Sequence, residues 1–138
     1  MRNIIILRMA FPNDPTQSVK PHQMYVSIQT EKQLEFYSIS SILGKETRVY
    51  GLEKDNYYTI TGAIQENNGF RVPSFIDCAK AYIIEEPQAD YDNLSGRVID
   101  EKLISEISFT IENCKKRGVY KKYTINENDL IEWNNNLK

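Results

Sequence analysis

The spacing of apolar residues changes near residue 100, and this change constrains the fold more than any other feature of the chain. Residues 24–29 alternate between apolar and polar positions, which is the period-2 pattern of a strand with one buried face. Over residues 100–118 the apolar residues recur every three or four positions instead, as on one face of a helix. A chain that passes from period 2 to period 3.6 once is expected to be an α+β protein, with strands first and a helix after them.

The first two thirds of the chain contain several short segments rich in β-branched and aromatic residues, separated by turn signals such as Asn67-Asn68-Gly69. Strands at this close spacing predict a small β-barrel or a strongly curved sheet over about residues 2–85. The expected strands number about five to seven. They lie over residues 3–11, 24–29, 34–39, 48–50, 57–64, 70–77 and 80–84.

Two of these strands are expected to form a hairpin. Residues 24–29 and 34–39 are joined by the short polar segment 30–33, which favours antiparallel pairing. The start of the first strand then lies beside the end of the second.

The C-terminal third is expected to be helical over about residues 98–138, within a single domain 1–138. Asp100 is the natural N-cap of an amphipathic helix, and Gly118 is suited to the position just after its end. A second, shorter helix is expected from about Asn126.

The overall charge excludes a uniformly basic nucleic-acid binder. The 138 residues include 17 Lys and Arg and 19 Asp and Glu, a net charge of −2. A local basic face remains compatible with this balance, because binding depends on the local field.

The few metal-binding and thiol residues narrow the chemistry further. One histidine and two cysteines are too few for a Cys/His zinc site without carboxylates, and we expect neither a metal nor a cofactor. Two free thiols fit a reducing compartment, and a single disulfide between them is the alternative. The sequence contains no apolar run of signal-peptide or membrane-spanning length, so we expect a cytoplasmic protein with no membrane partner.

The hairpin brings together the best candidate site. Lys20 precedes a proline, which restricts its backbone, and His22 is the only histidine. Antiparallel pairing places both near Ser40 and Ser41, where a cation, an imidazole and two hydroxyls suit a phosphate and a proton transfer. The alternative is that Lys20 and His22 are ordinary surface residues and that the serines only end a strand.

Two weaker candidates lie elsewhere. Cys78 is expected to be a small core residue and not a nucleophile. The basic residues at 115–117 and at 121–122, with Tyr120 and Tyr123 between and after them, suit a nucleic-acid backbone. They equally suit a cationic helix end that complements the helix dipole.

The order of these segments resembles the MazF/PemK (Kid) toxins and the similar ToxN-type toxins. The resemblance covers roughly residues 2–117 as a series of short motifs, and the segment 119–138 has no counterpart in it. The motifs are an N-terminal strand (Ile4–Leu7), a basic residue before proline (Lys20-Pro21), a strand ending in Ser40-Ser41, a late strand with the sequence VPSFID, and the segment LSGRVIDEKL leading into the helix. It implies an SH3-like barrel.

The resemblance also implies an activity: metal-independent cleavage of single-stranded RNA, in which the ribose 2′-OH attacks the adjacent phosphate and leaves a 2′,3′-cyclic phosphate. It implies a toxin that an antitoxin, protein or RNA, holds in check, and a homodimer. Lys20 then stabilises the phosphate charge, Ser40 or Ser41 binds the phosphate, and His22 is the acid or base. MazF-type enzymes usually have arginine where this chain has Lys20, which favours the ToxN-like site or a weakened MazF-like one. The expected RNA contacts are Gln23, Tyr25, Tyr37, Lys45 and Arg71.

Two other hypotheses stay open at this stage. One is a non-catalytic binding or assembly module on the same barrel, which the lack of a strong acid–base pair favours. The other is an unrelated small β-barrel, in which Lys20, Ser40 and Ser41 do not meet. If the nuclease hypothesis holds, purified protein should cleave RNA in EDTA, and the Lys20→Ala variant should not.

Overall fold

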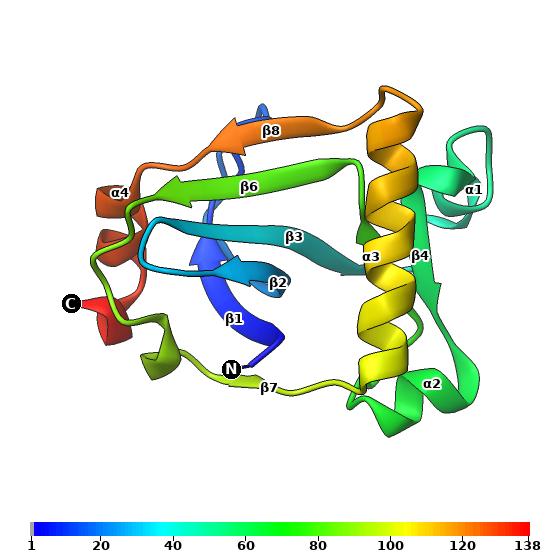
Figure 1. Ribbon diagram of the computed structural model, residues 1–138, viewed down its shortest axis with the longest axis horizontal. Coiled ribbons are helices and arrows are strands. Elements are labelled where there is room, and N and C mark those ends of the chain that lie inside the picture. Colours follow the sequence, from blue (N-terminus) through cyan, green and yellow to red (C-terminus); the bar gives the residue numbers. More distant parts are fainter. Residues whose placement is uncertain (1) are drawn as a thin grey trace.

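A computed structural model describes residues 2–138 and shows an α+β fold in which one curved sheet carries helices at its edges and faces (Figure 1). The sheet contains eight strands, more than the five to seven expected. In chain order the elements are β1 (Ile4–Met9), β2 (Lys20–Gln29), β3 (Gln33–Ser41), α1 (Glu46–Val49), η1 (Lys54–Asn56), β4 (Tyr57–Ile60), α2 (Gly62–Asn67), β5 (Ser74–Asp77), β6 (Lys80–Glu85), η2 (Tyr91–Asn93), β7 (Gly96–Arg97), α3 (Glu101–Lys116), β8 (Lys121–Thr124), α4 (Glu127–Trp133) and η3 (Asn135–Leu137).

The strand order is β4-β5-β3-β2-β1-β7, and β3 organises the rest of the sheet. The C-terminal part of β3 pairs with β5, whereas its N-terminal part pairs with β6, which in turn pairs with β8. The pair β6–β8 is parallel and the other pairs are antiparallel. The sheet is curved but does not close, since β4 and β7 form the two ends of this order.

The expected hairpin is confirmed. Strands β2 and β3 pair antiparallel, with Gln23 opposite Ile39 and Met24 opposite Ser38. The Thr30 N–H donates to the Gln33 carbonyl at 2.9 Å and closes the turn. Successive residues of β2 therefore point to opposite faces of the sheet, and the two faces pack against different cores.

Two apolar cores cover the two faces. One core joins Tyr37 and Ile76 to the buried face of α3, which includes Leu103 and Ile107. The second core joins Met24, Phe36 and Tyr82 on the other face to Leu130 of α4. Because the two faces of β3 pack against different cores, residues 34–37 and Ile39 are all buried.

The helix ends follow the sequence signals. The Asp100 carboxylate accepts the Leu103 N–H at 2.7 Å and caps α3, and Gly118 adopts φ +74° just after it. This left-handed conformation favours glycine because it has no Cβ. Asn126 likewise accepts the Asn128 N–H and caps α4.

Three expected strands are wrong or partly wrong. Arg48 and Val49 belong to α1 and Tyr50 is its C-cap; this one helical turn buries Val49 in a small core with Ile42 and Phe75. The segment 57–64 is a strand only to residue 60, because Gly62 turns the chain at φ +64° and α2 follows. The strand expected over 70–77 begins at residue 74. Tertiary packing and backbone turns outweighed β-propensity in these segments.

The segment 119–138 is built into the sheet and the second core. It adds β8 beside β6 and places Leu130 and Leu137 in the core at 0% and 6% exposure. The Asn134 side chain accepts the Arg8 N–H and donates to the Arg8 carbonyl, so it pairs with the backbone of β1 as a strand would.

Candidate functional site

A polar hollow of about 300 Å³ lies where the second core meets the surface; we call it the central hollow. Strands β2 and β3 contribute His22, Ser38 and Ser40. The remaining walls come from the segment after β1, from α1 and its N-terminal flank, and from β5 and β6. Their polar side chains are Asn13, Asp14, Lys45, Arg48, Asp77, Lys80 and Tyr82.

The β2–β3 register explains why the histidine and the two serines meet. Met24 is opposite Ser38, and alternate residues of a strand share a face. His22 and Ser40, each two positions nearer the hairpin's open end, therefore lie on that same face, and both line the central hollow. The hairpin inferred from sequence is thus what assembles this part of the site.

The environment of His22 favours the neutral imidazole. Its ring is half-buried and lies 4.7 Å from the ring of Phe11. Burial lowers its pKa below the usual value near 6.5, and the charges of Lys20 and Lys45 lower it further, while a hydrogen bond with the Met9 backbone acts in the opposite direction. A neutral imidazole that donates through one nitrogen keeps the other nitrogen free to accept a proton.

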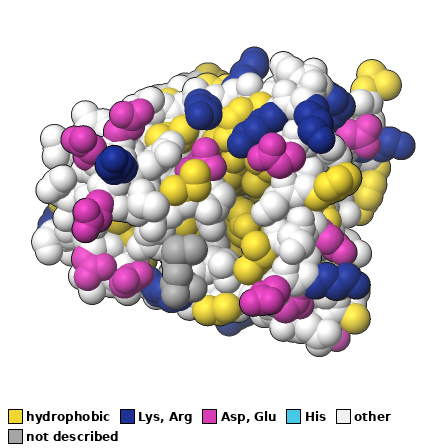
Figure 2. Space-filling view, in the orientation of Figure 1, with side chains coloured by type: hydrophobic (Ala, Val, Ile, Leu, Met, Phe, Trp, Pro, Cys, Tyr) yellow, Lys and Arg dark blue, Asp and Glu magenta, His cyan; other side chains and the backbone are white. Residues whose placement is uncertain are grey.

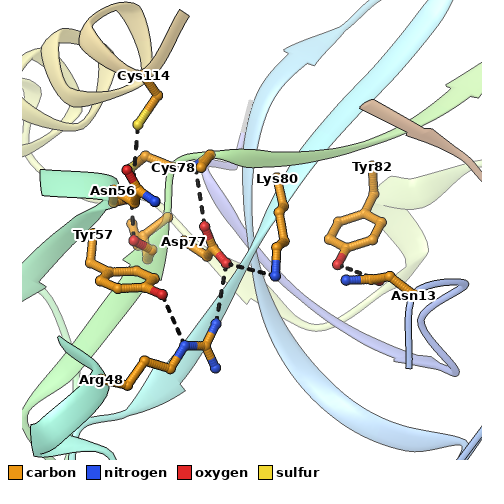
Figure 3. Close-up of polar contacts among 11 residues, drawn as sticks. Asn13, Arg48, Asn56, Tyr57, Asp77, Cys78, Lys80, Tyr82 and Cys114 are labelled. Atoms are coloured by element: carbon orange, nitrogen blue, oxygen red, sulfur yellow. Dashed lines mark hydrogen bonds and ion pairs between the residues drawn. The ribbon is translucent and has the colours of Figure 1, made fainter. Parts of the chain in front are cut away.

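A buried carboxylate fixes two cations in the hollow (Figure 3). Asp77, whose side chain is 6% exposed, lies 3.4 Å from the Arg48 guanidinium and 3.8 Å from the Lys80 ammonium. It also accepts the Ala79 N–H at 3.2 Å. Burial raises the pKa of Asp77, an effect that Lys80, the Ala79 N–H and Arg48 oppose.

Aromatic rings hold the cations and the hollow's rim in place. The Arg48 guanidinium donates to the Tyr57 hydroxyl at 2.9 Å and lies over that ring. The Lys45 ammonium lies 5.9 Å from the centre of the Phe75 ring. On the other side of the hollow the Tyr82 hydroxyl donates to Asn13 at 2.9 Å, which ties the segment after β1 to β6. Lys45 and Arg48 are thus also held by aromatic rings, which add no negative charge to the hollow.

The structure brings together three of the predicted site residues: His22, Ser40 and Lys45. Lys20 is exposed and does not line the hollow, although its charge acts on His22. Ser41 follows Ser40 in the strand and so points to the opposite face, where its hydroxyl accepts the Leu43 N–H at 3.2 Å. The expectation that Ser41 shares the site with Ser40 is therefore wrong in geometry.

The remaining predicted RNA contacts lie away from the hollow. Tyr25 and Tyr37 are 2% and 0% exposed in the core beneath α3, where no base can stack on them. Gln23 points to the face opposite His22, because it is the next residue in the strand. Arg71 is exposed in the turn after α2, outside the residues that line the hollow. Alternation alone did not show which face of the hairpin α3 would cover.

Several residues of the hollow were not identified from sequence. Ser38 carries a signal, since it lies two positions before Ser40 in the same strand. Arg48, Asp77 and Lys80 carry no local signal, because β3 pairs with both β5 and β6 and this non-local pairing brings them together. The two cysteines are free and buried, and burial raises the pKa of Cys78 well above its ordinary value, which fits a core residue.

The arrangement of side chains in the central hollow can bind an anion and accept a proton.

Within residues 2–138 there is no cluster of three or more His, Cys, Asp or Glu side chains that suits a metal ion. None of the helices in the described part of the chain has the length and apolar character needed to cross a membrane. The sequence matches no model of a known protein family, and no curated protein is similar to it.

Proposed function

We propose that the protein is a metal-independent endoribonuclease that cleaves single-stranded RNA in the central hollow, and that it acts as a toxin restrained by an antitoxin. The observation that carries this proposal is the composition of the hollow. It contains the chain's only histidine, two serine hydroxyls and the three cations Lys45, Arg48 and Lys80. Cations and hydroxyl donors bind phosphate oxygens, and a histidine held neutral is suited to remove a proton near pH 7.

The proposed reaction uses the RNA's own 2′-hydroxyl as nucleophile. The free nitrogen of His22 accepts the 2′-OH proton while the 2′-oxygen forms a bond with phosphorus. The bond from phosphorus to the 5′-oxygen then breaks, and that oxygen takes a proton from water in the open hollow. The products are a 2′,3′-cyclic phosphate and a 5′-hydroxyl.

The positions of the side chains suggest a division of roles. Arg48 and Lys80, held by Asp77, stabilise the charge that develops on the non-bridging oxygens. Ser38 and Ser40 donate to the phosphate from β3. Lys20 lowers the pKa of His22 through its charge and attracts the anionic substrate. Arg48 and Lys80 take the role of main phosphate ligand that the sequence predicted for Lys20.

The local charge also supports an anionic substrate. The hollow is lined by three Lys or Arg side chains and two carboxylates, in a chain whose net charge is −2. One of those carboxylates, Asp77, is the group that positions the cations. A phosphate therefore meets a net positive site on a slightly acidic protein.

Cleavage of a labelled single-stranded RNA by the purified full-length protein in EDTA tests the proposal. We expect a 2′,3′-cyclic phosphate product and strongly reduced cleavage in Ser38→Ala/Ser40→Ala and in Arg48→Gln. Cleavage should be unchanged in Lys32→Gln, whose side chain is exposed in the β2–β3 turn. Product that forms only with added metal contradicts the proposed chemistry. No cleavage of any RNA, with stable capture of a partner, favours the non-catalytic binding module.

A further inference from the structure

A second hollow lies directly beside the central hollow, and the C-terminal segment builds one of its walls. It has a volume of about 430 Å³ and shares Asp77 and Lys80 with the central hollow. Its opposite wall contains Val119 and Lys121, which belong to the segment without a counterpart in the toxins that the sequence resembles. A chain that ended at residue 118 would leave this side open.

A third hollow continues from the second. The two share Tyr57, and the third is lined by Lys54 of η1 and by Lys116 and Arg117 at the C-terminal end of α3. Figure 2 shows lysine and arginine side chains gathered along this edge of the molecule, above the end of α3 and the start of β8. Each hollow thus shares lining residues with the next one.

In the described part of the chain, most of the cations that line the second and third hollows form no ion pair; Lys80, which contacts Asp77, is the exception. Together the three hollows are lined by seven Lys or Arg side chains and four carboxylates. Within residues 2–138, Lys54, Lys116 and Lys121 take part in no ion pair. The Arg117 guanidinium donates to the Asp55 carbonyl and to the Asn56 side-chain oxygen, both uncharged.

One pair of lysines indicates that an anion belongs here. Lys80 and Lys121 are direct register partners in the parallel pair β6–β8. Like charges directly opposite one another in a sheet destabilise it, and Asp77 contacts Lys80 but not Lys121. A phosphate bound in the second hollow between the two ammonium groups would offset this repulsion.

We propose that the second and third hollows bind the backbone of single-stranded RNA next to the phosphate that is cleaved in the central hollow. This inference rests on the proposed function, because it assigns the neighbouring part of the same substrate. Lysine is a point-charge ligand for phosphate, whereas the cores of protein interfaces are poor in lysine. The lysines at 54, 80, 116 and 121 therefore favour a nucleic-acid strand over an acidic protein as the occupant.

Binding of a non-cleavable RNA separates this inference from the activity. The probe is a fluorescein-labelled, fully 2′-O-methylated oligonucleotide, either 3 or about 12 nucleotides long, and the full-length protein is titrated at several salt concentrations. The test variant is Lys116→Gln/Lys121→Gln. The matched control is Lys32→Gln/Lys102→Gln, which removes the same charge from exposed positions outside the three hollows.

We expect the test variant to bind the long probe more weakly, with the slope of log K against log salt reduced by about 1.4, the value for two lost contacts to a single strand. Binding of the short probe to the test variant should change little relative to the wild type. Binding of the long probe to the control variant should also change little. An unchanged slope, an equal loss in the control, or no binding of the long probe by the wild type overturns the inference.

The two proposals fail separately. If the wild type cleaves RNA but the slope is unchanged in the test variant, the proposed function stands without these subsites. If the wild type does not cleave RNA but the slope falls as expected, the binding surface stands and the nuclease proposal fails.

Discussion

Replacement of His22 by glutamine is the sharpest test of the proposed chemistry. Glutamine keeps a polar side chain of similar length but cannot take up the 2′-OH proton. Loss of a positioned general base lowers the rate by about 10²- to 10⁴-fold, which corresponds to about 3 to 5 kcal/mol of transition-state stabilisation. Because His22 is half-buried against Phe11, unfolding in urea should be measured alongside, to show that the variant is folded.

The role proposed for His22 also predicts how the cleavage rate depends on pH. A histidine with a pKa near 6.5 is about three-quarters neutral at pH 7, and burial and the charges of Lys20 and Lys45 lower the pKa of His22 below that value. A base acts in its neutral form, so kcat/KM should fall as the pH drops below the pKa of His22 and should be level above it. The midpoint should lie below pH 6.5, and this acid limb should disappear in His22→Gln.

The assay is cleavage of a short labelled RNA in EDTA from pH 5 to 8, on the wild type, His22→Gln, Lys20→Gln and Lys32→Gln. Removal of the Lys20 charge should raise the pKa of His22 and move the midpoint to higher pH, whereas Lys32→Gln should leave it in place. A rate in His22→Gln within about twofold of the wild type at pH 7 would refute the reasoning. So would a rate that rises towards acid pH.

Three further predictions concern the framework of the site. Arg48→Gln should lower the cleavage rate by about 10²-fold, because the phosphate loses a ligand for its developing charge. The free energy of unfolding should change by less than about 1 kcal/mol, because Arg48 is 48% exposed. Cleavage kinetics check the first result and urea unfolding checks the second. Leu130→Ala should cost about 2–5 kcal/mol in urea, since Leu130 is 0% exposed in the second core. Asn134→Ala leaves the Arg8 N–H and carbonyl without their partner and should cost about 1–3 kcal/mol. Losses below 1 kcal/mol in both of the last two would show that the C-terminal segment contributes little to stability.

The parts of the site that the sequence predicted are those set by local pairing. The alternation of residues 24–29 and the short polar turn were enough to place His22 beside Ser40. They did not establish which residues face the hollow, because that depends on the core that each face buries. Ser41, Tyr25 and Tyr37 were assigned to the site although they lie on the other face.

The cations that were missed depend on contacts distant in sequence. Asp77 ends β5 and Lys80 begins β6, and both reach the hollow because β3 pairs with each of those strands. Arg48 was expected in a strand, and instead α1 places it over Tyr57 and within reach of Asp77. The sequence contains these residues, but it does not show that they lie close together, because that depends on the order of the strands in the sheet.

Composition could not identify the site for a related reason, since a net charge of −2 gives no indication of where charges are held. Asp77 has two opposite effects on the hollow: it removes one positive charge from the sum, and it fixes Arg48 and Lys80 within 3.4 and 3.8 Å of one carboxylate. Cations held in advance need no reorganisation when phosphate charge develops, which is what makes such groups effective. A carboxylate that counts against RNA binding in the overall charge would therefore favour the proposed cleavage through its position, and only the structure distinguishes the two effects.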